Sequence, residues 1–249
     1  MKDGKIIHHI HIPKCGGSSI KRVLESENWT KVRVPIVVGQ ENIRMYFEHV
    51  ADPVRARVSD GKLYTGHEHR EIWSRWDINV EFQFTVFRNP YSRFHSHIKQ
   101  YISHQDWYKD LKVKQSLLFP VDNLRNLLTY ISPGYEETHT SNGITTTWGG
   151  MGDEDNHYRP QHQFVGQNTA CFKIESDMPK LLEVLKERNI VSANATMPFI
   201  NSHKADIAIP WNDEKYKDLH QKFIELYKGD FKIPGYNVET SQNWNGELL

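Results

Sequence analysis

Residues 5–19 read KIIHHIHIPKCGGSS, and this stretch gives the strongest indication of the fold class. The β-branched run Lys5–Ile12 predicts a short buried strand that stops at Pro13. Two glycines follow, and apolar residues then recur at helical spacing over Ile20–Glu25. A strand, a glycine turn and a helix in direct succession are typical of an α/β protein with a mainly parallel sheet.

The remainder of the chain alternates predicted strands and helices in the same way. Further strands are predicted at Lys31–Val38, Lys62–Thr65, Glu81–Arg88 and Thr169–Ile174. Helices are predicted at Glu41–Val50, Tyr91–Ile102, Asp122–Ile131, Met178–Arg188 and Asp213–Tyr227. Residues 132–160 lack clear periodicity, so a functional or mobile loop is expected there. We expect one domain over residues 1–238 and a poorly ordered tail at residues 239–249.

The composition excludes several classes of protein. Among 249 residues, 31 Lys and Arg balance 31 Asp and Glu, so a protein that coats nucleic acid is not expected. Two cysteines cannot build a disulfide framework or a four-thiolate zinc site. No apolar run is long enough for a secretory signal or a membrane span, and we therefore expect a cytoplasmic protein.

The neutral total hides an uneven distribution of charge along the chain. Residues 5–24 contain four cations and no acid, and residues 82–105 contain three cations and no acid. These cations are Lys5, Lys14, Lys21, Arg22, Arg88, Arg93 and Lys99. Positive charge is thus concentrated in two segments, as expected for a protein that binds one small polyanion.

The first of these segments has the composition of an anion-binding loop. A helix that begins after small residues exposes free backbone N–H groups and the positive end of its dipole. Lys14 adds a full charge, and the pair Gly16–Gly17 lets the backbone approach a ligand closely. Ser18 and Ser19 supply hydroxyl groups. The combination suits a phosphate or sulfate group, although the lysine precedes the glycines and the Walker A pattern is therefore absent.

A second anion site is predicted where the strand Glu81–Arg88 ends. Arg88 leaves the strand, Pro90 opens the next helix, and Ser96 lies about two turns into that helix. This order can bring a guanidinium group and a hydroxyl group together, and Arg is the natural bidentate partner of phosphate. Arg93, in the same helix, is expected to form a structural ion pair.

Together, the two segments resemble PAPS-dependent sulfotransferases, in particular the carbohydrate type that includes heparan sulfate 2-O-sulfotransferases. PAPS is 3′-phosphoadenosine-5′-phosphosulfate. Residues 11–19 resemble the family's 5′-phosphosulfate loop, with Cys15 and Ser18 at positions that commonly carry Thr or Ala and Thr, and residues 88–96 resemble its 3′-phosphate motif. The resemblance implies a P-loop-like three-layer sandwich whose central sheet is flanked by helices. It also implies transfer of a sulfuryl group from PAPS to an acceptor hydroxyl, with release of 3′,5′-ADP and no required metal.

The resemblance assigns roles to individual residues. It implies that Lys14 binds PAPS and takes part in catalysis, and that Arg88 and Ser96 bind the 3′-phosphate. The other PAPS-binding residues that it implies are Cys15, Gly16, Gly17, Ser18 and Ser19. A carbohydrate is the expected acceptor, and a small metabolite, a lipid or a peptide tyrosine stays open.

A candidate for the catalytic base lies in residues 64–69, which read YTGHEH. They follow a predicted strand and resemble the His-Gly-His-type segment that holds the base in the 2-O-sulfotransferases. A neutral imidazole suits this role because its ordinary pKa lies near neutral pH. We predict His67 as the general base, with His69 as the alternative or as a substrate contact.

Three further segments resemble the same family. They are Asn156–Gln161, Phe172–Glu175, and Leu226–Phe231 with the following Gly235–Tyr236. The last of these patterns has an alternative explanation. A helix that ends at a glycine and packs on aromatic residues would show the same sequence without belonging to this family.

Three other functions are compatible with parts of the sequence. A nucleotide kinase or NTPase would hold Mg²⁺ through a loop Ser or Thr and a strand-end Asp, whereas Arg88 stands at this strand end. A metal site could combine His9 and His11, which share a strand face, with His67 and His69, although no spacing is diagnostic. A non-catalytic carbohydrate-binding module could use tryptophans such as Trp107 and Trp148.

Overall fold

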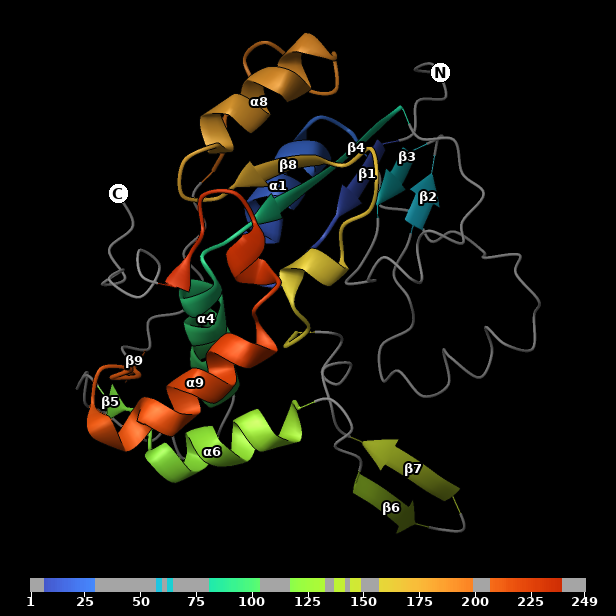
Figure 1. The fold of residues 1–249 in the computed structure, drawn as a ribbon. Coiled ribbons are helices and arrows are strands. Elements are labelled where there is room, and N and C mark those ends of the chain that lie inside the picture. The colour runs from blue at the N-terminus through green and yellow to red at the C-terminus, as the bar shows by residue number, and fades with distance from the viewer. Residues whose placement is uncertain are drawn as a thin grey trace. The chain divides into compact units, whose positions relative to one another are not determined.

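The computed structural model describes most of the predicted helices and strands. The described residues are 7–29, 57–59, 62–64, 81–103, 117–132, 137–141, 144–148, 157–198 and 207–238. They divide into two compact units, each described by itself (Figure 1). Unit 1 comprises residues 1–88, 154–156 and 163–200, and unit 2 comprises residues 89–153, 157–162 and 201–249. This division does not test the single domain predicted over residues 1–238, which stays a prediction.

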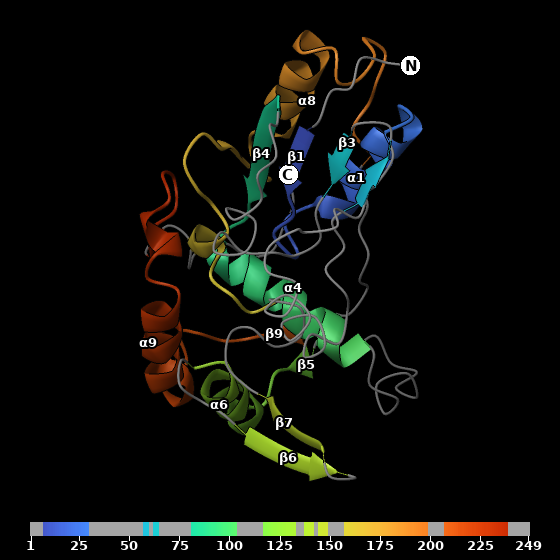
Figure 2. The same cartoon turned by 90° about the vertical axis from the view of Figure 1, so that its right-hand side faces the viewer.

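A three-stranded parallel sheet forms the centre of unit 1 (Figure 1). Its strand order is β1–β4–β8, formed by Ile7–Ile10, Phe82–Phe87 and Ala170–Lys173. The prediction of an α/β protein with parallel strands is therefore confirmed for this sheet. The antiparallel hairpin of β2 (Arg57–Ser59) and β3 (Lys62–Tyr64) lies beside β1 (Figure 2).

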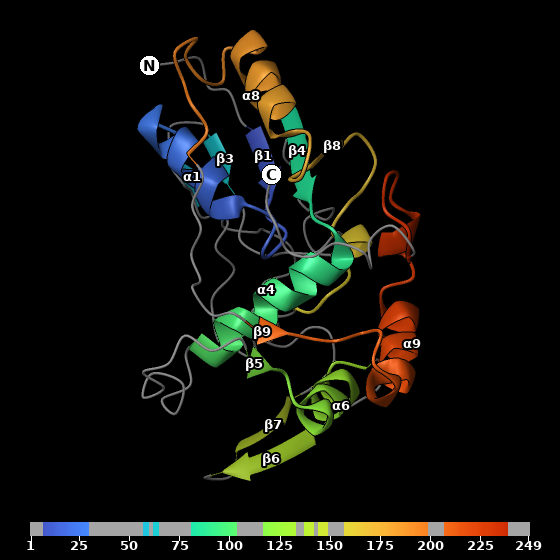
Figure 3. The same ribbon diagram turned by 90° about the vertical axis from the view of Figure 1, so that its left-hand side faces the viewer.

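Helices α1 (Gly17–Ser26) and α8 (Met178–Glu187) cover the same face of this sheet, as Figure 3 shows. Alternate strand residues share a face, and one buried cluster joins that face to both helices. Its members on the sheet are Ile7, Phe82, Phe84, Val86 and Phe172, and its members on the two helices are Ile20, Val23, Leu24, Met178, Leu181 and Leu185. The three-layer arrangement requires helices on both faces of the sheet, and it stays a prediction.

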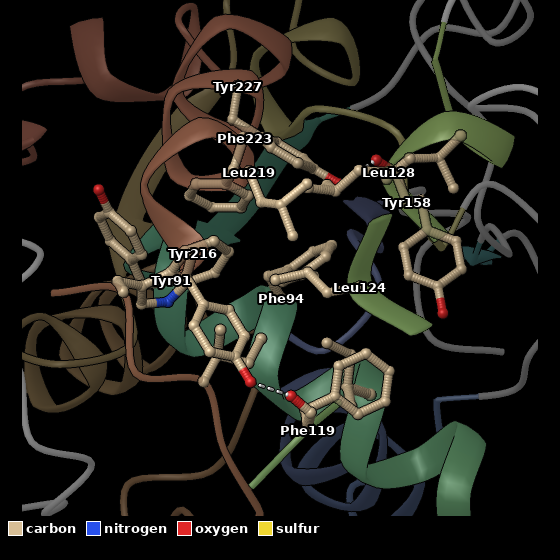
Figure 4. Close-up of a cluster of buried hydrophobic side chains, with 14 of the residues drawn as sticks. Tyr91, Phe94, Phe119, Leu124, Leu128, Tyr158, Tyr216, Leu219, Phe223 and Tyr227 are labelled. Atoms are coloured by element: carbon tan, nitrogen blue, oxygen red, sulfur yellow. Dashed lines mark hydrogen bonds between the residues drawn. The ribbon is translucent and has the colours of Figure 1, made fainter. Parts of the chain in front are cut away.

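Unit 2 has a core that is rich in aromatic side chains (Figure 4). Helices α4 (Pro90–Ser103), α6 (Val121–Tyr130) and α9 (Lys217–Leu226) contribute to this core. The labelled core residues in Figure 4 are Tyr91, Phe94, Phe119, Leu124, Leu128, Tyr158, Tyr216, Leu219, Phe223 and Tyr227. The hydroxyl of Tyr216 donates to the carbonyl of Phe119 at 2.7 Å, which satisfies a polar group that burial would otherwise penalise.

Most predicted elements agree with the structure to within one or two residues, and two segments differ. The helix predicted over Asp213–Tyr227 is divided, because the Asp213 carboxylate accepts from the Lys215 N–H and caps a separate short helix, η2 (Glu214–Tyr216). The segment without periodicity contains an antiparallel hairpin of β6 (Glu137–Ser141) and β7 (Ile144–Trp148). The remaining short elements are β5 (Leu117–Leu118), β9 (Ile207–Ala208), η1 (Gln161–Gln163) and η3 (Asp230–Lys232). The predicted strand Lys31–Val38, the predicted helix Glu41–Val50 and the tail lie outside the described residues.

Asp230 joins two segments of unit 2 that the sequence singled out separately. Its carboxylate is fully buried and accepts from the backbone N–H groups of Gln161 at 2.9 Å and His162 at 3.0 Å. The same carboxylate lies 2.8 Å from Nδ1 of the His162 ring. Nearby, the Tyr227 hydroxyl donates to the Tyr158 carbonyl at 2.7 Å. These contacts give the segments around residues 157–162 and 226–231 a structural role in unit 2.

Replacing Asp230 by Ala should lower the free energy of unfolding by about 3 kcal/mol, because the buried N–H of Gln161 and the part-buried N–H of His162 lose their acceptor. Urea denaturation measures this change. The control is Asp122→Ala, whose exposed carboxylate pairs with Arg125 on the surface of α6 and should change stability by less than about 1 kcal/mol. Equal effects of the two variants would contradict the structural role of Asp230.

Candidate functional site

The turn between β1 and α1 has a backbone conformation that few residues adopt. Lys14 and Gly16 both lie in the left-handed region, with φ of 67° and 81°. Glycine adopts this region freely, whereas a lysine held there is strained, and such strain clusters at ligand sites. A Cβ at Gly16 would lie 2.9 Å from Cδ1 of Ile174, so a side chain there would also require the Ile174 side chain to shift. The Cys15 N–H donates to the Ile12 carbonyl at 3.3 Å and closes the turn.

The first turn of α1 presents backbone donors to a ligand. Gly16 occupies the N-cap position, and in the described part of the chain no side chain caps this turn. The Ser19 N–H donates to the Gly16 carbonyl at 3.0 Å, which tightens the turn. The Ser18 side chain is exposed and the Ser19 side chain is buried. The positive end of the α1 dipole is therefore available beside the predicted anion loop.

The structure brings Arg88 to this turn. Arg88 follows β4, and its Nη1 donates to the backbone carbonyl of Lys14 at 3.2 Å. The two residues are 74 positions apart in the sequence, and each belongs to a different predicted anion motif. They meet because β1 and β4 are neighbouring parallel strands, whose carboxyl ends lie at one edge of the sheet. The site in unit 1 thus combines an uncapped helix end with a lysine and an arginine.

The charges of this site act on one another. Burial and, to a smaller extent, the positive charge of Arg88 together lower the pKa of Lys14 to about 8, while Cys15 acts in the opposite direction. Two cations held close together repel, and an anion bound beside them would be attracted by both. A perturbed lysine next to a second cation is a feature of functional sites rather than of ordinary surfaces.

The second predicted anion motif is divided between the two units. Arg88 ends the first segment of unit 1, whereas Ser96 lies in the second turn of α4 in unit 2 and is half-buried. Their joint contact with one phosphate stays a prediction. At the start of α4, the Asn89 side chain accepts from the N–H groups of Tyr91 at 3.0 Å and Ser92 at 3.2 Å. Backbone donors of α4 are thus already used, and a phosphate there would depend on side chains.

Arg93 is a buried residue of α4 that contacts the backbone of unit 2. Its side chain is buried in unit 2, and Nη2 donates to the His157 carbonyl at 2.9 Å. A carbonyl oxygen satisfies such a donor. The structural ion pair predicted for Arg93 stays a prediction.

The predicted bases His67 and His69 lie outside the described residues. The described chain before them ends at Tyr64, the last residue of β3, and β3 lies beside β1. Cys15 and Gly17 are both buried in the turn, where they form part of the predicted loop. The His11 ring lies against Gly17, where it occupies the space that a side chain at position 17 would need. No pattern in the sequence indicates this contact.

The alternative metal site has no support in the described part of the chain. No group of three or more His, Cys, Asp or Glu side chains is gathered there. His9 and His11 share a face of β1, as predicted, but their rings stack at a centroid distance of 5.6 Å. His8 faces the other way, and burial lowers its pKa to about 4, so this imidazole is neutral at pH 7.

Comparisons with known proteins add no assignment to these observations. No family model matches the chain, and the comparisons with curated proteins and with solved structures also give no match. Within the described residues, no helix has both the length and the apolar character needed to cross a membrane.

The lowered pKa of Lys14 predicts that anion affinity depends on pH. Sulfate keeps its charge between about pH 7 and about pH 9.5, while Lys14 loses its proton above about 8, so the attraction falls as pH rises. Calorimetric titration with sodium sulfate should show an affinity about tenfold weaker at the upper pH. Lys14→Met should bind sulfate weakly throughout and show no such decline. A wild-type affinity that stays constant over this range would contradict the role of Lys14.

Proposed function

We propose that this protein is a PAPS-dependent sulfotransferase that transfers the sulfuryl group of PAPS to an acceptor hydroxyl. The observation that carries the proposal is the contact between Arg88 and the Lys14 carbonyl, which joins two separately predicted anion motifs at one sheet edge. One ligand with two anionic groups, as in PAPS, suits such a pairing better than a single phosphate does. A P-loop-like fold with helices on both faces of the sheet is part of the same proposal.

The residues of the turn suit the 5′-phosphosulfate end of PAPS. Lys14 supplies a positive charge, and the backbone donors at the start of α1 supply hydrogen bonds. Gly16 and Gly17 allow close approach of the backbone, Ser18 offers an exposed hydroxyl, and Ser19 and Cys15 complete the loop. Charge that develops on the leaving phosphate oxygen during transfer would be stabilised by these groups.

The 3′-phosphate is assigned to Arg88 together with Ser96. Arg88 donates from Nη1 to the Lys14 carbonyl, and the planar fork of a guanidinium group suits a bidentate contact with phosphate. Arg88 thereby fixes the loop and binds the same ligand. Lysine cannot reproduce both contacts, because it lacks the planar fork of donors.

The base in this proposal is His67, with His69 as the alternative. PAPS supplies an activated sulfuryl group, whose bond to the 5′-phosphate oxygen breaks as the bond to the acceptor oxygen forms. His67 accepts the proton of the acceptor hydroxyl, and 3′,5′-ADP leaves. A carbohydrate hydroxyl is the acceptor we propose. The segment that contains His67 follows β3, which lies beside β1.

The assignment of the 3′-phosphate predicts a clear preference between two nucleotides. Calorimetric titration should show tighter binding of 3′,5′-ADP than of 5′-AMP. Arg88→Ala should weaken 3′,5′-ADP binding by about 1.5–3 kcal/mol, the value of a charged hydrogen bond, and reduce the preference over 5′-AMP. The control Arg125→Ala removes an exposed arginine of α6 and should leave both affinities unchanged. Equal wild-type affinities for the two nucleotides would overturn the assignment.

The proposed base predicts a loss of turnover without a loss of nucleotide binding. His67→Ala should lower kcat by about 10²–10⁴-fold, the usual contribution of a general base, while the affinity for 3′,5′-ADP is kept. The assay follows transfer from labelled PAPS to a panel of hydroxyl acceptors, with and without a chelator. His69→Ala is the matched comparison, and a larger loss in that variant would reverse the two roles. ATP-dependent, chelator-sensitive transfer would instead identify a kinase.

A further inference from the structure

The rings of four residues form a column that ends at the anion loop. Phe82 stacks on Phe84 at a centroid distance of 5.4 Å, and Phe84 stacks on His9 at 4.9 Å. His9 in turn stacks on His11 at 5.6 Å, and each successive pair of rings lies within 18° of parallel. The column crosses from β4 to β1 and fixes the plane of the last ring, His11.

One edge of the His11 ring occupies the space where a side chain at position 17 would lie. A Cβ placed on Gly17 would overlap Nε2 and the neighbouring ring carbons of His11. Gly17 is the first residue of α1 and has no side chain of its own, so the imidazole edge occupies that space. His11 therefore packs between the ring of His9 and the start of α1.

We propose that His11 is a positioning residue of the anion site, acting through its contact with Gly17. The inference rests on the proposed function of the loop. Loop residues Lys14 and Gly16 have left-handed backbones, and the Gly16 carbonyl accepts the first hydrogen bonds of α1, so the conformation of the turn and the start of the helix are linked. The contact between the His11 ring and Gly17 fixes the position of the first turn of α1 relative to Lys14. A displacement of about 1 Å in such a group can cost 10²-fold in activity.

The location of His11 separates this role from that of an ordinary core residue. His9 and Phe84, the inner members of the column, are 1% and 0% exposed, whereas His11 is half-buried. His11 lies three positions before Lys14, at the end of the column where the anion loop begins. A residue whose only role is to fill the core would be expected among the inner rings of the column, which are fully buried.

The experiment is a double-mutant cycle of His11 and Gly17, in which the double variant should recover part of the 3′,5′-ADP affinity that each single variant loses. His11→Ala should weaken 3′,5′-ADP binding by about 10- to 100-fold, because the start of α1 loses its support. Gly17→Ala should weaken it to a similar extent, because the new methyl group displaces the ring. The double variant His11→Ala with Gly17→Ala should bind more tightly than either single variant, since the methyl group occupies the space that the ring has left. Calorimetric titration gives the affinities, and thermal unfolding gives the stability of each variant.

Gly229→Ala provides a matched control in unit 2. A Cβ on Gly229 would overlap the ring of His162, so this variant creates the same kind of clash away from the anion loop. It should lower the unfolding temperature and leave 3′,5′-ADP affinity unchanged. A merely structural role of His11 would give the same pattern, with reduced stability and unchanged affinity, and would overturn the inference.

The failure of this inference can be told from the failure of the proposed function. Wild-type protein that binds sulfate but not 3′,5′-ADP would contradict the proposed function, and the cycle is then measured with sulfate. Unchanged affinity in His11→Ala, or a double variant weaker than both single variants, would overturn the role of His11. If His11→Ala does not fold, His11→Asn, which keeps a smaller polar side chain, should show the same weakened binding.

Discussion

The hydrogen bond from the Arg88 guanidinium group to the Lys14 carbonyl is the interaction on which the candidate site depends. It exists because β1 and β4 are parallel neighbours, with Ile10 beside Thr85 in the register. The Thr85 hydroxyl donates to the Ile10 carbonyl at 2.8 Å, within a fully buried environment, and helps to hold that register. A shift of one residue would turn the Arg88 side chain to the other face of the sheet. The site is thus a consequence of strand pairing.

Much of the fold could be predicted because its main elements have strong local patterns. The β-branched run before Pro13 and the Asn89–Pro90 pair before α4 mark boundaries that physical chemistry enforces. Residues 137–148 were not predicted as strands because they are mostly polar and show no clear alternation of apolar residues, although the Asn142–Gly143 pair in the sequence between the strands is typical of a tight hairpin. The two-residue strands β5 and β9 are too short for any periodic signal, and only their pairing with each other defines them.

The candidate site was predictable in its residue types and less so in its contacts. The positions of Lys14 and Arg88 follow from the rule that parallel strands end at one sheet edge, so their proximity could be expected. The contact of His11 with Gly17 depends on a ring orientation that is set by stacking on His9, and no local pattern encodes it. The sequence also did not indicate that Asp230 accepts hydrogen bonds from backbone N–H groups, because these groups lie about 70 residues earlier in the chain.

The electrostatics of the loop favour ligand binding at the expense of stability. The pKa of Lys14 is about 8 in the folded protein and lies near 10.5 in the unfolded chain, so folding penalises the charged form. The penalty is full below about pH 8, and it disappears as pH rises through the unfolded value, so this group adds stability toward alkaline pH. At neutral pH the fold therefore keeps a half-buried lysine beside an arginine although their repulsion is unfavourable. An anion that contacts both cations, as proposed for PAPS, would offset this repulsion and so stabilise the fold as it binds.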